Sequence, residues 1–179
     1  MSKFIGIKKL WYGAPINATS AENLTQAGVA TLIAASTEIK NVHQDTWGYQ
    51  QGDPNVTDYI NELTGKTYYR DKVDEGEKTI NFTMGEYDFS TKKALQGGTV
   101  IEESGTAVGW KAPINPELIN KSIIALTKTN SYIIFTNASI VGKGDQQQKA
   151  IGLGVTAVAM ESDVDGVSDE YWFDAPAQG

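Results

Sequence analysis

A chain of 179 residues, 40% of them hydrophobic and 21% charged, has room for one domain with a sizeable core. This composition excludes a disordered chain, and no apolar run approaches the roughly 20 residues that a membrane-spanning helix needs. The absence of cysteine excludes disulfides and thiolate sites. Lys8 and Lys9 interrupt the first apolar stretch, so no Sec-type export signal is expected. We therefore predict a single domain over 1–179 without a membrane partner.

The net charge of −7 is unevenly distributed along the chain. Residues 1–160 hold fifteen bases and sixteen acids, a net charge of −1, whereas 161–179 hold six acids and no base. The C-terminal stretch is therefore predicted to be an acidic segment. Lysine and arginine are scattered rather than clustered, which argues against a nucleic-acid-binding footprint.

The first predicted element is a helix over about 20–35. Thr19 and Glu22 have the spacing of a capping box, and an alanine-rich run follows them. Gly28 weakens this helix by about 1 kcal/mol relative to alanine. Its apolar stripe is modest, so we predict one helix that flanks a sheet.

A long polar excursion over 43–71 follows the helix. It contains the only histidine, His43, close to Asp45, but no nucleophile can be assigned to this pair. About thirty residues exceed an ordinary connection, which indicates a functional segment. Because aromatic anchors with a polar rim are typical of interfaces, we predict a docking arm rather than an active-site loop. The candidate docking residues are Trp47, Tyr49, Asp53, Tyr59 and Arg70.

Most of the remaining chain is predicted to form strands. Ile80, Phe82 and Met84 alternate with polar residues over 78–84, and a similar alternation recurs over 151–159. SIIALT and SYIIFT are spaced as a hairpin. Short helical pieces are expected near 90–95 and after Pro116. Seven to nine strands with one main helix predict a mainly β fold, an antiparallel β-sandwich or barrel with a long hairpin or loop arm.

The uncharged, β-branched stretch SYIIFT is expected to be an edge strand that pairs with a neighbouring subunit. Its candidate edge residues are Ile133, Ile134 and Phe135. No catalytic residue, cofactor or metal ligand is predicted. DVDGVSDE at 163–170 has its glycine at the fourth position, so it is not an EF-hand loop, and a tight turn is favoured over a calcium site, which stays open.

Five stretches together resemble the major tail tube proteins of long-tailed bacteriophages, whose relatives include the tube components of contractile injection machines. They are the early KFIGIKKLWYG, the excursion NVHQDTWGYQQGDPNVTDYINELTGKTYYRD, EKTINFTMGEYDF leading to STKKALQGG, the pair SIIALTKTNSYIIFTNASIVGKG, and the terminal IGLGVTAVAMESDVDGVSDEYWF. The resemblance covers nearly the whole chain, and this family has no catalytic motif to match.

The resemblance implies a structural virion protein, six copies of which form a ring, with rings stacked into a hollow tail tube. Its expected partners are further copies, other phage tail proteins, and genomic DNA that passes through an acidic lumen without specific binding. Assembly would take place in the host cytoplasm. Two other classes remain open: a carbohydrate-binding β-sandwich module, which would stack sugars on its aromatic residues, and a small β-fold enzyme.

Overall fold

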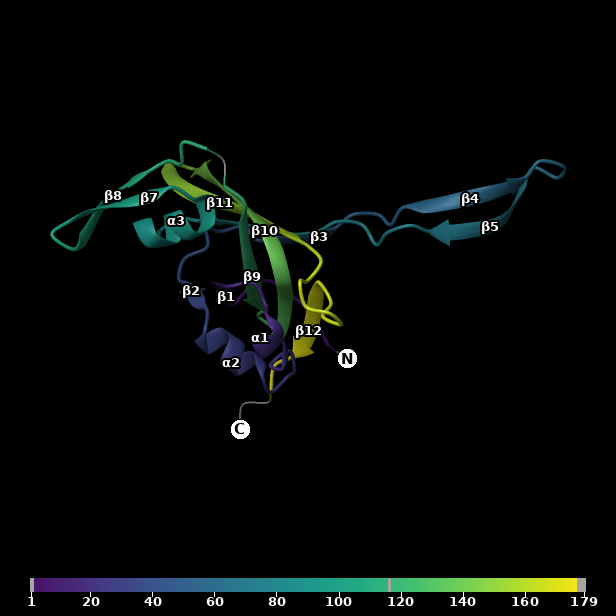
Figure 1. The fold of residues 1–179 in the computed structure, drawn as a ribbon, viewed down its shortest axis with the longest axis horizontal. Coiled ribbons are helices and arrows are strands. Elements are labelled where there is room, and N and C mark those ends of the chain that lie inside the picture. The colour runs from purple at the N-terminus through teal and green to yellow at the C-terminus, as the bar shows by residue number, and fades with distance from the viewer. Residues whose placement is uncertain (1, 116, 177–179) are drawn as a thin grey trace.

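The computed structural model describes residues 2–115 and 117–176, and its largest element is an eight-stranded antiparallel sheet (Figure 1). Seven strands are hydrogen-bonded in the order β2 (Thr37–Ile39), β1 (Lys9–Gly13), β9 (Ile119–Leu126), β10 (Ser131–Gln147), β11 (Ala150–Ala159), β6 (Lys78–Met84) and β3 (Gly48–Gln51). The eighth, β12 (Glu170–Asp174), pairs with β10. The predicted mainly β, antiparallel fold is confirmed.

The 17-residue strand β10 is the spine of this sheet. Its first half pairs with β9 on one edge and with β12 on the other, and its second half pairs with β11. Ile133, Ile134 and Phe135 therefore have partners on both sides and are buried. The predicted edge position of these residues is wrong, because the acidic, aromatic stretch EYWFD forms the strand that covers them.

Phe135 lies in the first half of this spine, between β9 and β12, and is completely buried. Replacing it with alanine is expected to lower the free energy of unfolding by about 3–5 kcal/mol, through lost burial and the cavity left behind. Urea unfolding monitored by circular dichroism measures this change. Ile151, which is 74% exposed, is the control, and its replacement by alanine should change stability by about 0.5 kcal/mol or less.

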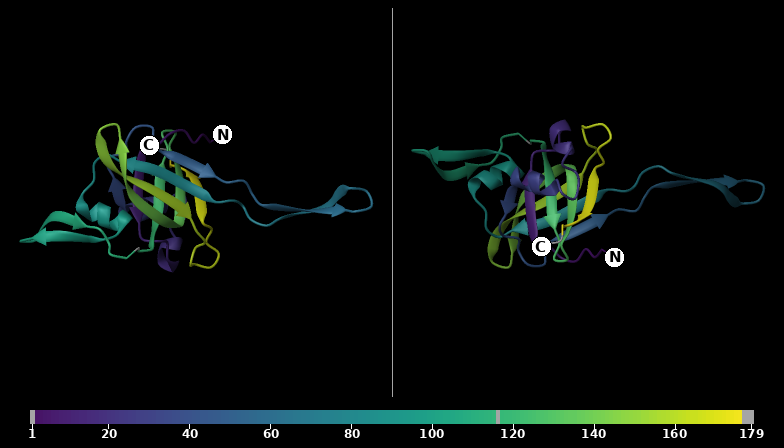
Figure 2. Two further views of the ribbon diagram at one scale, coloured as in Figure 1. Left: turned by 90° about the horizontal axis from the view of Figure 1, so that it is seen from above. Right: turned by 90° about the horizontal axis from the view of Figure 1, so that it is seen from below.

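The core consists of two apolar clusters on opposite faces of the central strands. Alternation along β9 sends Ile123 into one cluster and Ile124 into the other, as the period of two requires. The main sheet is strongly curved (Figure 2). The first cluster takes side chains from β1, β6, β9, β10 and β11. The second cluster lies between β1, β9 and β10 and the two N-terminal helices, where Val29 and Leu32 are buried.

The prediction of one continuous helix over 20–35 is wrong. The segment forms two short helices, α1 (Ala18–Ala21) and α2 (Val29–Ala34), and the capping box is made by Asn17 and Ser20. The chain turns back tightly between the helices, because a Cβ on Gly28 would come within 2.5 Å of the Asn23 carbonyl oxygen.

A third helix, α3 (Phe89–Gln96), confirms the helical piece expected near 90–95. The short helix expected after Pro116 is not present in the described residues that follow this position, because β9 begins at Ile119. Pro116 itself lies outside the described residues. None of the helices in the described part of the chain is long and apolar enough to cross a membrane.

Two hairpins extend from the body in opposite directions along the longest axis (Figures 1 and 2). One consists of β4 (Val56–Asn61) and β5 (Lys66–Lys72), and the other of β7 (Thr99–Glu103) and β8 (Thr106–Lys111). Neither hairpin pairs with the main sheet within the described residues. The molecule is therefore a compact body with a projection at each end.

Candidate functional site

The longer projection, which we call the arm, comprises residues 52–77. The backbone N–H of Gly52 donates to the Glu77 carbonyl at 2.8 Å, just beyond the pairing of β3 with β6. From this point outward every residue is exposed except Asn61 and Gly76, which are half-buried. An arm was predicted over 43–71, and the structure moves its start because 48–51 form β3 of the body.

The arm has two chemically different faces. Tyr59 lies opposite Tyr69, their ring centroids 5.5 Å apart, and the next pair on this face is Thr57 with Asp71. We call these four residues the aromatic face. The other face carries an ion pair, in which the Arg70 guanidinium donates to both carboxylate oxygens of Asp58 at 2.5 and 2.9 Å. This hydrogen bonding lowers the pKa of Asp58 below its usual value.

Large apolar side chains remain exposed along the arm. Leu63 in the turn is 95% exposed, and Ile60, Tyr68 and Val73 are each more than half exposed. An isolated two-stranded hairpin is at best marginally stable in water. Contiguous exposed apolar groups on such an element are typical of a surface that another molecule covers.

The structure separates the five predicted docking residues. Tyr59 and Arg70 lie on the arm, and Asp53 lies at its base. Trp47 and Tyr49 instead pack against the first core cluster, and the Tyr49 ring lies 5.3 Å from that of Trp172. They therefore belong to the body rather than to the arm, and because both are only partly buried their role in docking stays a prediction.

Sequence reasoning missed the apolar residues at the end of the arm. Ile60 lies near the end of β4 and Leu63 lies in the turn, and both are exposed, although neither was predicted to take part in docking. The stretches VTDYIN and KTYYRD, separated by ELTG, carry the signal of a hairpin with a glycine in its turn. Gly65 takes a positive φ of 63°, as that turn requires.

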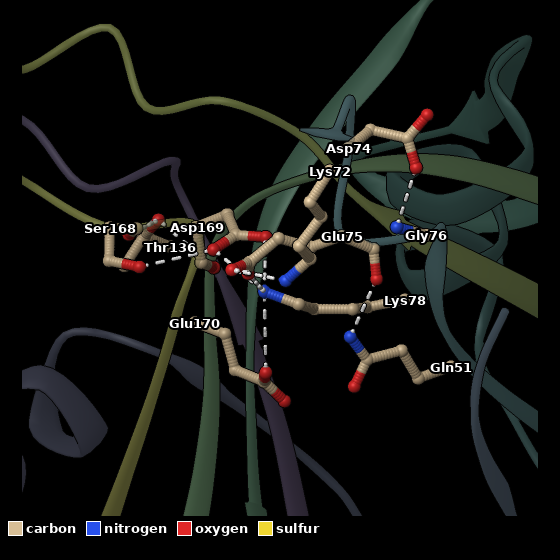
Figure 3. A network of polar contacts seen from close by, with 10 residues as sticks. All are labelled: Gln51, Lys72, Asp74, Glu75, Gly76, Lys78, Thr136, Ser168, Asp169 and Glu170. Carbon is tan, nitrogen blue, oxygen red and sulfur yellow. Dashed lines mark hydrogen bonds and ion pairs between the residues drawn. The ribbon is translucent and has the colours of Figure 1, made fainter. Parts of the chain in front are cut away.

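A partly buried ion-pair network connects the base of the arm to the start of β12 (Figure 3). Lys78, the first residue after the arm, places its Nζ 2.8 and 3.0 Å from the carboxylate oxygens of Asp169. A carboxylate oxygen of Glu170 lies 3.6 Å away, and one of Glu75 lies 3.8 Å away. The side chains of Lys78 and Glu170 are only 9% and 11% exposed, so their charges depend on each other for compensation.

The network shifts the proton affinity of two of its groups. Burial by itself would lower the pKa of Lys78, but hydrogen bonding to Asp169 and the nearby carboxylates raise that pKa above its usual value. Burial, followed by hydrogen bonding to Glu170, raises the pKa of Tyr49. The folded protein therefore holds both protons more tightly than the unfolded chain does.

Both shifts predict a loss of stability in alkali. A raised pKa in the folded state contributes stability that is complete below the unfolded values, about 10.4 for lysine and about 10 for tyrosine, and is lost at higher pH. We expect the urea midpoint to fall as pH rises from about 9 to about 11. Tyr49→Phe should fall less steeply than the wild type over the same range, and an identical slope would contradict the role of Tyr49.

Among the described residues, the side chains of His43 and Asp45 make few polar contacts. The ring of His43 lies 3.2 Å from the Gln44 carbonyl, and the Asp45 side chain has no hydrogen bond among the described residues. Across 2–115 and 117–176 no three histidine or carboxylate side chains are grouped as metal ligands would be. In DVDGVSDE, Gly166 has a φ of 74°, and Asp169 is bound to Lys78.

Comparison with known proteins gives no further assignment. No protein-family model matches the chain, and no curated protein matches it in sequence.

Proposed function

We propose that this protein is a structural virion subunit whose copies form rings that stack into the hollow tail tube of a long-tailed bacteriophage. The observation that carries the proposal is the arm, a hairpin that projects from a β body and exposes aromatic and apolar side chains. In the assembled tube the arm contacts a neighbouring copy. Other tail proteins bind the ends of the tube, and the protein performs no catalysis.

The direction of the two projections supports an open-ended assembly. The two hairpins project from opposite ends of the body (Figure 2). An arm at one end would therefore contact a surface of a different kind on the next copy, which is a heterologous contact. Heterologous contacts generate closed rings or extended filaments rather than two-fold dimers. A stacked tube combines both outcomes.

Ring closure requires free strand edges, and the sheet offers them at its ends. β2 and β3 terminate the strand order, so each has one unpaired edge within the described residues. Residues 133–135 of β10 already have a paired strand on each side, β9 and β12. We therefore propose that β2 and β3, rather than 133–135, make the contacts within a ring. Burying the free edges between subunits would also prevent uncontrolled aggregation.

The acidic segment fits a conduit for DNA. Glu161, Asp163 and Asp165 are exposed, whereas Asp169 and Glu170 of the same segment are paired with Lys78. A negative inner surface repels phosphate, so DNA can slide through without being held. Genomic DNA is thus a passing cargo of the tube rather than a bound ligand.

Electron microscopy of the purified protein tests the proposal. Rings or tubes are expected, together with species much larger than the 19.4 kDa chain in sedimentation velocity. A protein that stays monomeric at all concentrations would contradict the proposal. A monomer that bound glycans through Tyr59 and Tyr69 would instead support the carbohydrate-binding class.

A further inference from the structure

A second exposed surface lies where the N-terminal segment crosses the turn between β9 and β10. The backbone N–H of Lys8 donates to the Leu126 carbonyl at 2.7 Å, and that of Lys128 donates to the Ile5 carbonyl at 3.0 Å. Phe4 packs edge-on against Trp172 of β12, with ring centroids 4.5 Å apart. Although residues 2–8 form no helix or strand, they are held firmly against the body.

This surface combines positive charge with apolar area. We define the N-terminal patch as Lys3, Phe4, Ile5, Lys8 and Lys128. Phe4 is 40% exposed and Ile5 is 59% exposed. None of the three lysines forms a salt bridge with a described residue, and Lys8 Nζ only contacts the Asn130 side-chain oxygen at 3.2 Å.

The arm has the opposite charge and similar apolar content. Residues 52–77 hold seven acids and three bases, a net charge of −4. On the aromatic face, Asp71 stands beside Tyr69 and forms no salt bridge with a described residue. Glu62, next to the exposed Leu63, adds a second carboxylate at the turn.

We propose that the N-terminal patch of one copy is the surface that receives the aromatic face of another copy's arm. Tyr59 and Tyr69 would cover Phe4 and Ile5, while the carboxylates of Glu62 and Asp71 face the lysines of the patch. The arm leads away from its own body, so it reaches a patch only on a second molecule (Figures 1 and 2). The inference rests on the proposed function, because it names the contact between copies on which the tube depends.

A pair of charge reversals tests this contact. The patch variant carries Lys8→Glu and Lys128→Glu, and the arm variant carries Glu62→Lys and Asp71→Lys. Each variant alone brings like charges together, so each should lose the fast-sedimenting assemblies that the wild type forms. Mixed in equal amounts they should recover those assemblies, because each arm then meets a patch of opposite charge in alternating copies.

Two controls separate the contact from general effects of charge. Lys93→Glu with Lys149→Glu makes the same change of net charge at exposed lysines outside the patch and should assemble as the wild type does. The milder Lys8→Gln with Lys128→Gln removes the charges without reversing them, and should weaken assembly in a salt-dependent way. Thermal melting establishes that every variant is folded.

The outcomes distinguish this inference from the proposed function. If the wild type forms no assemblies, the proposed function fails and the inference fails with it. If the wild type assembles but the mixture of folded variants does not recover, the proposed function stands and the patch is not the acceptor. Variants that assemble alone as well as the wild type would also overturn the assignment.

Discussion

Replacing Val56–Lys72 by a two-residue Asn-Gly turn is expected to give a folded protein that forms neither long tubes nor stacked rings, although β2 and β3 can still close single rings. The chain ends left by this deletion are already adjacent, because the Val73 N–H donates to the Asn55 carbonyl at 2.8 Å. The removed residues contribute nothing to either core cluster. Stability should therefore change by no more than about 1 kcal/mol. Electron microscopy and sedimentation measure assembly, and thermal melting measures stability.

The boundaries of this deletion matter. A deletion that began at Gln50 would cut β3 and confuse folding with docking, since Gln50 pairs with Thr79 of β6. Tubes of wild-type length from the shortened protein would show that the arm is not the docking element. A shortened protein that failed to fold would show that the arm supports the body, contrary to its exposure.

Lys78→Met is expected to lower the free energy of unfolding by about 3–5 kcal/mol. The substitution keeps the length and apolar stem of the side chain but leaves the carboxylates of Asp169 and Glu170 without their buried cation. Urea unfolding at neutral pH measures the loss. Adding Glu170→Gln should restore part of it, because one of the two uncompensated charges is then removed.

Lys72→Met is the matched control for this substitution. Lys72 pairs with the same Glu75 at 3.3 Å, but its side chain is 53% exposed. An exposed ion pair contributes at most about 1 kcal/mol, so the control should be nearly neutral. Equal effects of the two substitutions would mean that burial of the network does not determine its strength.

The alternation of apolar and polar residues was sufficient to predict strands that have one buried and one polar face. The alternation of Ile80, Phe82 and Met84 predicted a strand, and the structure has β6 over Lys78–Met84 with these three side chains buried. The same alternation was not sufficient to predict where a strand lies within the sheet. Whether β10 is central or at an edge depends on β12, whose residues lie far along the chain and carry acids that a strand pattern does not favour.

The arm was predictable as an excursion but not in its details. Its length and its Gly-Asp-Pro turn indicated a projecting segment, whereas Trp47 and Tyr49 could not be assigned to the body without knowing that 48–51 pair with β6. The pairing of Tyr59 with Tyr69 depends on a bulge between Tyr59 and Ile60, which sequence alone does not locate. No sequence pattern indicated the N-terminal patch, because the patch contains no helix or strand of its own and is formed by contacts between residues far apart in the chain.

The N-terminal patch also imposes an order of events during synthesis. Ser2 donates to the Asp174 carboxylate, 172 residues away, and Phe4 packs against Trp172 of the same strand. During synthesis the residues of the arm are therefore complete well before β12, against which the N-terminal segment packs. Contacts at such separation form late in folding. If the N-terminal patch is the acceptor proposed above, a copy can receive the arm of another copy only when its own body is complete.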